Sequence, residues 1–193
     1  MSAFSVQVAI ALGSNLGNRL EYIRTAITTL HRSHKITVID FSSVFESDAQ
    51  TLDEHETQPS YLNAIVLVAT SLSPVALLET CLQVESDNGR ERQLDRRWEA
   101  RTLDLDIILY GHEILNSESL KIPHPLLAQR RFVLQPLFEI RPDFHIPAPF
   151  DSSVRYLLAK CKDSSILKLH VSRPSLFSPD EFARPAPSLE QKR

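Results

Sequence analysis

Two aspartates, two positions apart, interrupt an apolar stretch of the sequence, "RTLDLDIILYG" at residues 101–111. In a β-strand, Asp104 and Asp106 point to the same face, about 6.6 Å apart. Two carboxylates at this separation repel each other by roughly 2 kcal/mol at an effective dielectric constant near 20. A hard divalent cation removes that repulsion, and oxygen ligands without His or Cys favour Mg²⁺. The spacing therefore favours a magnesium site, although an exposed sheet face on which both aspartates contact only water has the same spacing.

An arginine-rich segment directly precedes this strand. The segment "NGRERQLDRRWEAR" (88–101) holds five arginines against three acidic residues. Guanidinium groups bind phosphate oxygens, and carboxylates, Mg²⁺ and arginines together are the groups that phosphoryl transfer requires. The alternative is a solvent-exposed loop whose charges pair with one another. A nucleotide bound here does not use a Walker A loop, because none of the four glycines precedes a Lys-Ser or Lys-Thr pair.

The composition, 42% hydrophobic and 23% charged residues over 193 positions, is typical of one globular domain. A net charge of −3 and a pI near 6.2 disfavour nucleic acid and anionic membranes as partners. The sequence has no apolar run of the ~18 residues that a membrane span requires, and its start lacks the basic region of a signal peptide. We therefore expect a cytoplasmic protein. Cys81 and Cys161 form no CxxC motif, which argues against a disulfide framework or a zinc site.

Hydrophobic periodicity predicts four strands and two helices, in the order βαββαβ. Ser73 followed by Pro74 is a typical start for the second helix. This order predicts an α+β fold, the ferredoxin-like plait, with one antiparallel sheet, both helices on one face and the other face available for a site. The expected strands cover residues 5–12, 35–45, 61–70 and about 102–110, and the expected helices cover about 20–30 and 74–88.

We predict a single domain over residues 1–170, with the plait at about 5–111 and a small C-terminal extension at 112–170 that contains a helix at 152–160. Residues 171–193 mix prolines with charges and show little periodicity, so a disordered tail is expected there. The long acidic loop at 47–60 contains no Lys or Arg, and loops of that length are usually functional or mobile.

Several motifs together resemble one enzyme family. They are "ALGSNLGNR" (11–19), "QPSYLNA" (58–64), "GRERQ" (89–93), "RWEARTLDLDIILYG" (97–111) and "IPHPLLAQRRFVLQPLFEIRPD" (122–143). In this order and spacing, which cover about residues 6–150, the chain resembles the 6-hydroxymethyl-7,8-dihydropterin pyrophosphokinases of folate biosynthesis. The family fold is the same ferredoxin-like plait.

The resemblance implies transfer of diphosphate from ATP to the hydroxymethyl group of the reduced pterin, with release of AMP. It implies small-molecule substrates, two Mg²⁺ ions and ATP as co-substrate, and we expect a monomer. Asp104 and Asp106 match the metal ligands, and Arg90, Arg92 and Asp106 the catalytic residues, with Asp106 the nearest proton acceptor. The positions that match ATP-binding residues of the family are Glu85, Arg90, Arg92, Trp98, Arg101, Ile107, His124 and Arg130. The positions that match its pterin-binding residues are Gly13, Tyr61, Asn63 and Phe132.

The sequence departs from the family pattern at two places. Glu99-Ala100 stands where the family usually has Gly-Pro, and the loop "ESDAQTLDEHETQ" lacks the usual glycine and proline. These changes motivate an alternative, a non-catalytic relative that binds a nucleotide or a partner. A further alternative is a ferredoxin-like RNA-binding domain, but Asp104 and Asp106 on the sheet would repel a phosphate backbone.

Overall fold

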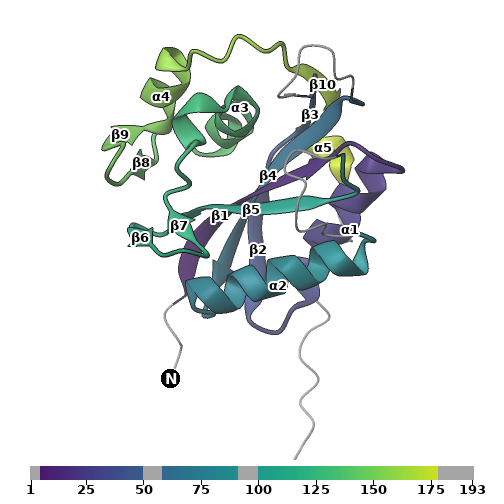
Figure 1. Cartoon of the computed structure of the whole chain (residues 1–193), viewed down its shortest axis with the longest axis horizontal. Coiled ribbons are helices and arrows are strands. Elements are labelled where there is room, and N and C mark those ends of the chain that lie inside the picture. The colour runs from purple at the N-terminus through teal and green to yellow at the C-terminus, as the bar shows by residue number, and fades with distance from the viewer. Residues whose placement is uncertain (1–4, 50–57, 91–99, 178–193) are drawn as a thin grey trace, which may run out of the picture.

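The computed structural model describes residues 5–49, 58–90 and 100–177, and its centre is a six-stranded antiparallel sheet (Figure 1). The strands follow the order β10-β3-β4-β1-β5, and β2 also pairs with β4. The strand β5, which carries both aspartates, is therefore at one end of this path. The strands are β1 (Val6–Ser14), β2 (Ile36–Phe41), β3 (Val44–Ser47), β4 (Tyr61–Thr70), β5 (Asp104–Tyr110) and β10 (Lys168–Val171).

Two helices, α1 (Arg19–Arg32) and α2 (Pro74–Asp87), cover one face of the sheet. The apolar stripe of α1 includes Ile23, Ile27 and Leu30, which are fully buried against the sheet. At the start of α2, Ser73 Oγ accepts a hydrogen bond from Ala76 N at 3.3 Å, as the Ser-Pro pair predicts. The predicted ferredoxin-like plait is confirmed.

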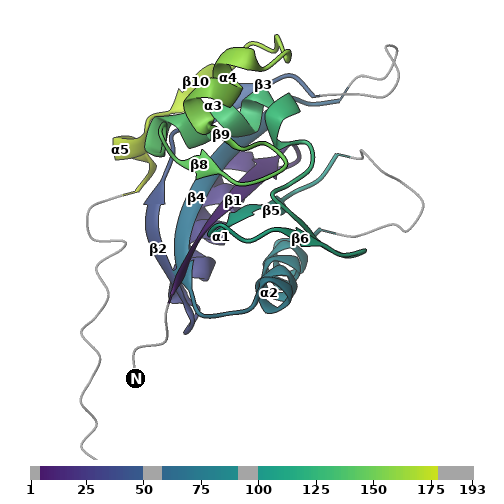
Figure 2. The same cartoon turned by 90° about the vertical axis from the view of Figure 1, so that its left-hand side faces the viewer.

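The appended region covers much of the opposite face (Figure 2). Helix α3 (Arg131–Ile140) packs Val133 and Leu137 against Leu67 and Leu109 of the sheet. Only one end of this face is therefore left for a site. The remaining elements of the region are β6 (Leu115–Asn116), β7 (Lys121–Ile122), the 3₁₀ turn η1 (Leu127–Gln129), β8 (His145–Ile146), β9 (Ser152–Ser153) and α4 (Val154–Lys160). Helix α4 is the helix expected at 152–160.

A β-bulge at Ile108 changes the direction of the side chains along β5. Ile10 pairs with Ile107 and Ala9 pairs with Leu109, so Ile108 is the extra residue. Ile107 packs on the α1 and α2 side, whereas Ile108 and Leu109 pack on the α3 side. One strand therefore contributes to both cores.

The C-terminal segment differs from the expected tail. Val171 belongs to β10, which pairs with β3, and a short helix, α5 (Arg173–Leu176), follows. Leu176 is fully buried and Phe177 is 9% exposed. The prediction of a disordered tail is therefore wrong for residues 171–177, because two apolar side chains dock there, and residues 178–193 lie outside the described part of the chain. No helix within the described part is long and apolar enough to cross a membrane.

Candidate active site

The uncovered end of the sheet brings together residues of three neighbouring strands. Gly13 of β1 pairs with Asn63 of β4 on one side and with Asp104 of β5 on the other. A Cβ atom added to Gly13 would lie 3.7 Å from Tyr61 Cδ1 and 3.9 Å from both Asn63 Oδ1 and Asp104 Cβ. The glycine therefore forms an open floor, with an acid on one side and an amide and an aromatic ring on the other.

Asp104 is held by two arginines. Its Oδ1 accepts a hydrogen bond from Arg90 Nη1, and its Oδ2 accepts one from Arg101 Nη1 at 3.0 Å. Burial acts to raise the pKa of Asp104, but the charges of Arg101 and Arg90 outweigh burial and hold the pKa below its ordinary value. Asp104 is therefore a carboxylate at neutral pH.

Asp106, on the same face, has a different environment. Its Oδ2 accepts a hydrogen bond from Arg130 Nη1 at 3.2 Å. Desolvation and then the negative charge of Asp104 raise the pKa of Asp106 to about 6, although Arg130 acts in the opposite direction. The two acids thus differ in proton affinity, and Asp106 is suited to accept a proton near neutral pH.

Glu85, at the end of α2, positions Arg90. The Glu85 side chain is 1% exposed; its Oε1 accepts from Leu105 N at 2.7 Å and pairs with Arg90 Nη1 at 2.6 Å. Gly89, with φ of +78°, follows the helix and allows the sharp turn that leads to Arg90. In this structure, Glu85 fastens α2 to β5 and orients the arginine that contacts Asp104.

Asn15, in the motif "ALGSNLGNR", fixes the backbone of Arg101. Arg101 N donates to Asn15 Oδ1 at 2.7 Å, and the Arg101 carbonyl accepts from the backbone N of Asn15 and Leu16 at 3.1 and 3.2 Å. Asn15 Nδ2 also donates to the Pro59 carbonyl at 3.3 Å. Sequence reasoning assigned no role to Asn15, because an asparagine after a strand looks like any turn residue. The one indication in the sequence that Asn15 has a role is its position within the motif "ALGSNLGNR".

The expected pterin residues lie around the same floor. Asn63 is 5% exposed, and its Nδ2 donates to Ser47 Oγ at 3.0 Å. Desolvation raises the pKa of Tyr61, so its phenol stays protonated. Phe132 lies in the first turn of α3, with the Arg130 guanidinium 5.7 Å from its ring centroid. Arg130 is therefore next to both Asp106 and Phe132.

His124 joins the site from the appended region. Its backbone N donates to the Ile108 carbonyl at 2.9 Å, and its Nδ1 accepts from Leu126 N at 3.2 Å. Burial and then the charge of Arg130 lower the pKa of His124 to about 4, so the ring is neutral at pH 7. Because Nδ1 is an acceptor, the neutral ring carries its proton on Nε2, which is then a donor.

The other predicted site residues are placed differently. Ile107 is 3% exposed and packs in the core beside α1 and α2, so its side chain is not available to a ligand. Arg92 and Trp98 lie outside the described residues, as do Glu99 and residues 50–57 of the acidic loop.

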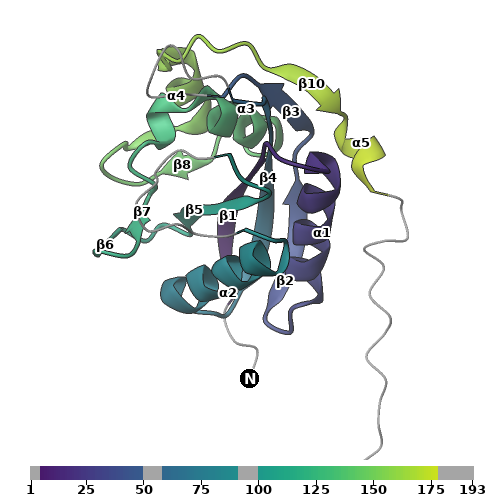
Figure 3. The same cartoon turned by 45° about the vertical axis from the view of Figure 1, so that its right-hand side comes forward.

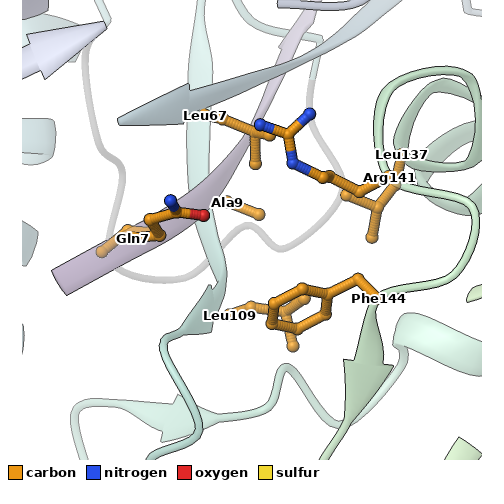
Figure 4. A pocket seen from close by; sticks show the side chains of 8 residues that line it. Gln7, Ala9, Leu67, Leu109, Leu137, Arg141 and Phe144 are labelled. Carbon is orange, nitrogen blue, oxygen red and sulfur yellow. The ribbon is translucent and has the colours of Figure 1, made fainter. Parts of the chain in front are cut away.

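A separate hollow lies where α3 meets the sheet. The hollow is partly open to solvent, and its walls are mostly apolar, with Gln7 and Arg141 the polar residues among those that line it (Figure 4). Gln7 is at the start of β1, whereas Gly13 is near the end of that strand. The hollow is thus distinct from the site around Asp104, whose charged groups come together on the open end of the sheet.

The model of one protein family, 7,8-dihydro-6-hydroxymethylpterin-pyrophosphokinase (HPPK), matches residues 9–142. The chain belongs to this family. It is 45% identical over 131 residues to 2-amino-4-hydroxy-6-hydroxymethyldihydropteridine pyrophosphokinase of Bacillus subtilis, an alignment that covers 68% of this chain and 75% of that one. It is 38% identical over 161 residues to the Haemophilus influenzae enzyme of the same name, with 83% and 96% covered. This confirms the family resemblance, and with it an ATP-dependent pyrophosphokinase of folate synthesis.

Some of the similar proteins are much longer than this chain. The chain is 38% identical over 138 residues to the folic acid synthesis protein fol1 of Schizosaccharomyces pombe, but it covers only 18% of that protein. The solved structure of wild-type Plasmodium falciparum HPPK-DHPS superposes with a TM-score of 0.61 at 13% identity, over 81% of this chain and 44% of that one. At 13% identity this structural similarity is evidence for the fold alone, and the two folds agree.

Proposed function

We propose that the HPPK chain carries out pyrophosphoryl transfer from ATP to 7,8-dihydro-6-hydroxymethylpterin on the open end of its sheet, with Asp104 and Asp106 as the ligands of two Mg²⁺ ions. The observation that carries this proposal is the set of three arginines around the two acids: Arg90 and Arg101 on Asp104, and Arg130 on Asp106. Two acids and three guanidinium groups in one place suit a triphosphate and its metal ions.

The donor set supports magnesium as the metal. Within the described residues, no group of three or more His, Cys, Asp or Glu side chains is arranged to hold a metal, so the site offers a pair of carboxylates. Mg²⁺ is usually bound by one or two carboxylates, with waters and substrate phosphates completing the octahedron. When bound, Mg²⁺ supplies positive charge that stabilises the phosphates and makes a nearby hydroxyl more acidic.

The phosphate groups of ATP would meet donors from three directions. Arg90 enters from the end of α2, Arg101 from the segment before β5, and Arg130 from the start of α3. These arginines can pass from the aspartates to phosphate oxygens with little movement, because both partners are anionic oxygens in the same place. His124 Nε2 adds a neutral donor. Arg92 and Trp98 remain predictions.

The pterin would lie over Gly13, with Asn63 at its edge and the rings of Tyr61 and Phe132 as walls, because a planar heterocycle suits aromatic faces and a few hydrogen bonds. The hydroxymethyl oxygen forms a bond to the β-phosphorus, and the bond from that phosphorus to the bridging oxygen of AMP breaks. Asp106 is the nearest carboxylate that would accept the hydroxyl proton.

The test is incubation of the chain with ATP, Mg²⁺ and the reduced pterin, with AMP and the pterin diphosphate measured together. Asp104→Asn and Asp106→Asn should each lower kcat/KM by ~10²-fold or more, because each removes an anionic Mg²⁺ ligand and so weakens the positive charge at the reacting phosphates. Asp143→Asn is the control, because that carboxylate is 78% exposed and pairs only with Arg155 in the described contacts. A variant at either acid that keeps a tenth of the activity would overturn the metal assignment.

A further inference from the structure

The segment from Asp163 to Phe177 lies beyond residue 142, where the match to the family model ends. It leaves the end of α4, passes to the edge of the sheet as β10 and ends with α5 near α1 (Figure 3). We call residues 163–177 the C-terminal strap. It contacts the rest of the molecule at three places, and two of them lead directly to residues around the Gly13 floor.

The first contact is at the N-terminus of α3. Asp163 Oδ2 accepts from Arg131 N at 2.9 Å, and Oδ1 accepts from Ser165 N at 2.9 Å. Helix α3 begins at Arg131, and the residue before it, Arg130, provides no side-chain cap. Asp163 therefore acts as the cap of α3 from a distant part of the sequence. This helix start carries Arg130, which contacts Asp106, and Phe132.

The second contact is along β3. In the antiparallel pairing of β10 with β3, Lys168 is opposite Glu46 and Leu169 is opposite Phe45. Without β10, β3 would be an edge strand paired only with β4. The next residue of β3, Ser47, accepts the hydrogen bond from Asn63 Nδ2.

The third contact anchors the end of the strap. Arg173 N donates to Ser43 Oγ at 2.9 Å, and the Arg173 guanidinium pairs with Asp40. Leu176 is fully buried, and the Phe177 ring meets the edge of Phe41 at 5.1 Å between centroids. These contacts keep β10 in place against β3.

We propose that the C-terminal strap is a positioning element for the pterin site: Asp163 fixes the helix start that carries Phe132, and β10 fixes β3, whose Ser47 accepts the hydrogen bond from Asn63. Loss of either contact increases the freedom of one wall, so substrate binding must then order it. Of the three arginines proposed for ATP, only Arg130 lies at this helix start, whereas Arg90 and Arg101 are held by Glu85 and Asn15, so the strap has a smaller influence on ATP than on the pterin. This inference rests on the proposed assignment of Phe132 and Asn63 to the pterin.

Two pairs of variants in the full chain test the proposal. Asp163→Ala removes the cap, whereas Asp163→Asn keeps one acceptor oxygen for Arg131 N but loses the acceptor for Ser165 N, and should therefore rescue the cap in part. Leu169→Pro disrupts the ladder between β10 and β3, whereas Leu169→Ala is its control, because the Leu169 side chain is 60% exposed. Asp163→Ala and Leu169→Pro should each raise the KM for the pterin about 3- to 10-fold and change the KM for ATP by less than 2-fold. Hydrogen exchange should quicken at residues 131–134 in the first variant and at 44–47 in the second.

The outcomes separate the strap from the proposed function. If Phe132→Ala and Asn63→Ala raise the pterin KM while Asp163→Ala and Leu169→Pro leave it unchanged, the strap proposal is wrong and the pterin site stands. If the strap variants raise both KM values equally, or Asp163→Asn behaves like Asp163→Ala, the strap has only a general structural role and the proposal is also wrong. If Phe132→Ala and Asn63→Ala leave the pterin KM unchanged, the pterin assignment and the strap proposal both fail.

Discussion

The two sides of the site are held in place by different means. On the side of the acids, a fully buried carboxylate, Glu85, orients Arg90 toward Asp104 over a short distance in sequence. On the side of Asn63, the partly exposed Glu46 accepts from Arg19 Nη1 at 2.9 Å and from Ser60 Oγ at 2.6 Å. The first side depends on desolvated charge and the second on a network near solvent. Disruption should therefore be costly on the first side and mild on the second.

The largest effect is expected from Glu85→Ala. The change leaves Arg90 and the Leu105 N–H without their buried partner, which should lower the free energy of unfolding by about 3–5 kcal/mol and weaken ATP binding. Urea unfolding and the KM for ATP measure the two effects. Glu79→Ala, an exposed position on the same helix, is the matched control. A loss below 1 kcal/mol would contradict the difference between the two sides.

A smaller effect is expected from Asn15→Ala, which affects both sides. The variant leaves the Arg101 N–H and the Pro59 carbonyl without the Asn15 side chain, so the free energy of unfolding should fall by about 1–3 kcal/mol. Because Arg101 and the chain before β4 are both released, the KM values for ATP and for the pterin should both rise. Asn116→Ala, at an exposed position in β6, serves as the control. A rise in only one KM would show that Asn15 serves only one side.

The raised pKa of Asp106 should affect how the free energy of unfolding, measured without Mg²⁺, depends on pH. Because the folded pKa of Asp106 is raised to about 6, the folded state binds more protons than the unfolded state between about pH 4 and 6. This contribution is destabilising and grows as the pH rises through that range. Asp106→Asn removes it, so the variant should gain stability relative to the wild type from pH 4 to pH 6. His124, whose lowered pKa acts in the opposite direction, is the same in both proteins. A constant difference across this range would show that Asp106 has an ordinary pKa.

The smallest effect is expected from Glu46→Gln. Hydrogen bonds from Ser60 and then Arg19 lower the pKa of Glu46, but the side chain is 30% exposed, so the pair is screened by water. The free energy of unfolding should fall by less than about 1 kcal/mol, with a small rise in the pterin KM. Glu118→Gln, at an exposed position, is the control. A loss as large as that of Glu85→Ala would remove the distinction between the two sides.

Local patterns predicted the plait but not what covers it. The period of two in β5 and the Ser-Pro start of α2 depend on neighbouring residues, and both are observed. The strand expected at 35–45 is interrupted at Ser42 and Ser43, where Ser43 N and Oγ donate to the carboxylate of Glu139 at 2.8 and 2.7 Å. A partner 96 residues away leaves no sign in the local pattern. The docking of Leu176 and Phe177 was missed for the same reason.

The site residues also fall into those that local sequence patterns predict and those that they do not. The spacing of Asp104 and Asp106 predicted that they share a face, and the arginine-rich segment places Arg90 and Arg101 beside them. Tyr61, Asn63, His124 and Phe132 were accessible only through the family resemblance, because an aromatic or amide residue near a strand end is ordinarily structural. Asn15 and Asp163 were missed because their partners are distant in sequence.

The bulge at Ile108 has a consequence for how this chain can diverge. The carbonyl of this extra residue receives the backbone N–H of His124, so the appended region is attached to the plait where the ladder is irregular. Insertions within the surface hairpin of β6 and β7 leave that attachment unchanged. Deletion of one residue between Asp106 and Leu109 would remove the bulge and with it this point of attachment, while Asp104 and Asp106 would keep their face of the sheet. We therefore expect the hairpin to tolerate changes of length more readily than β5 does.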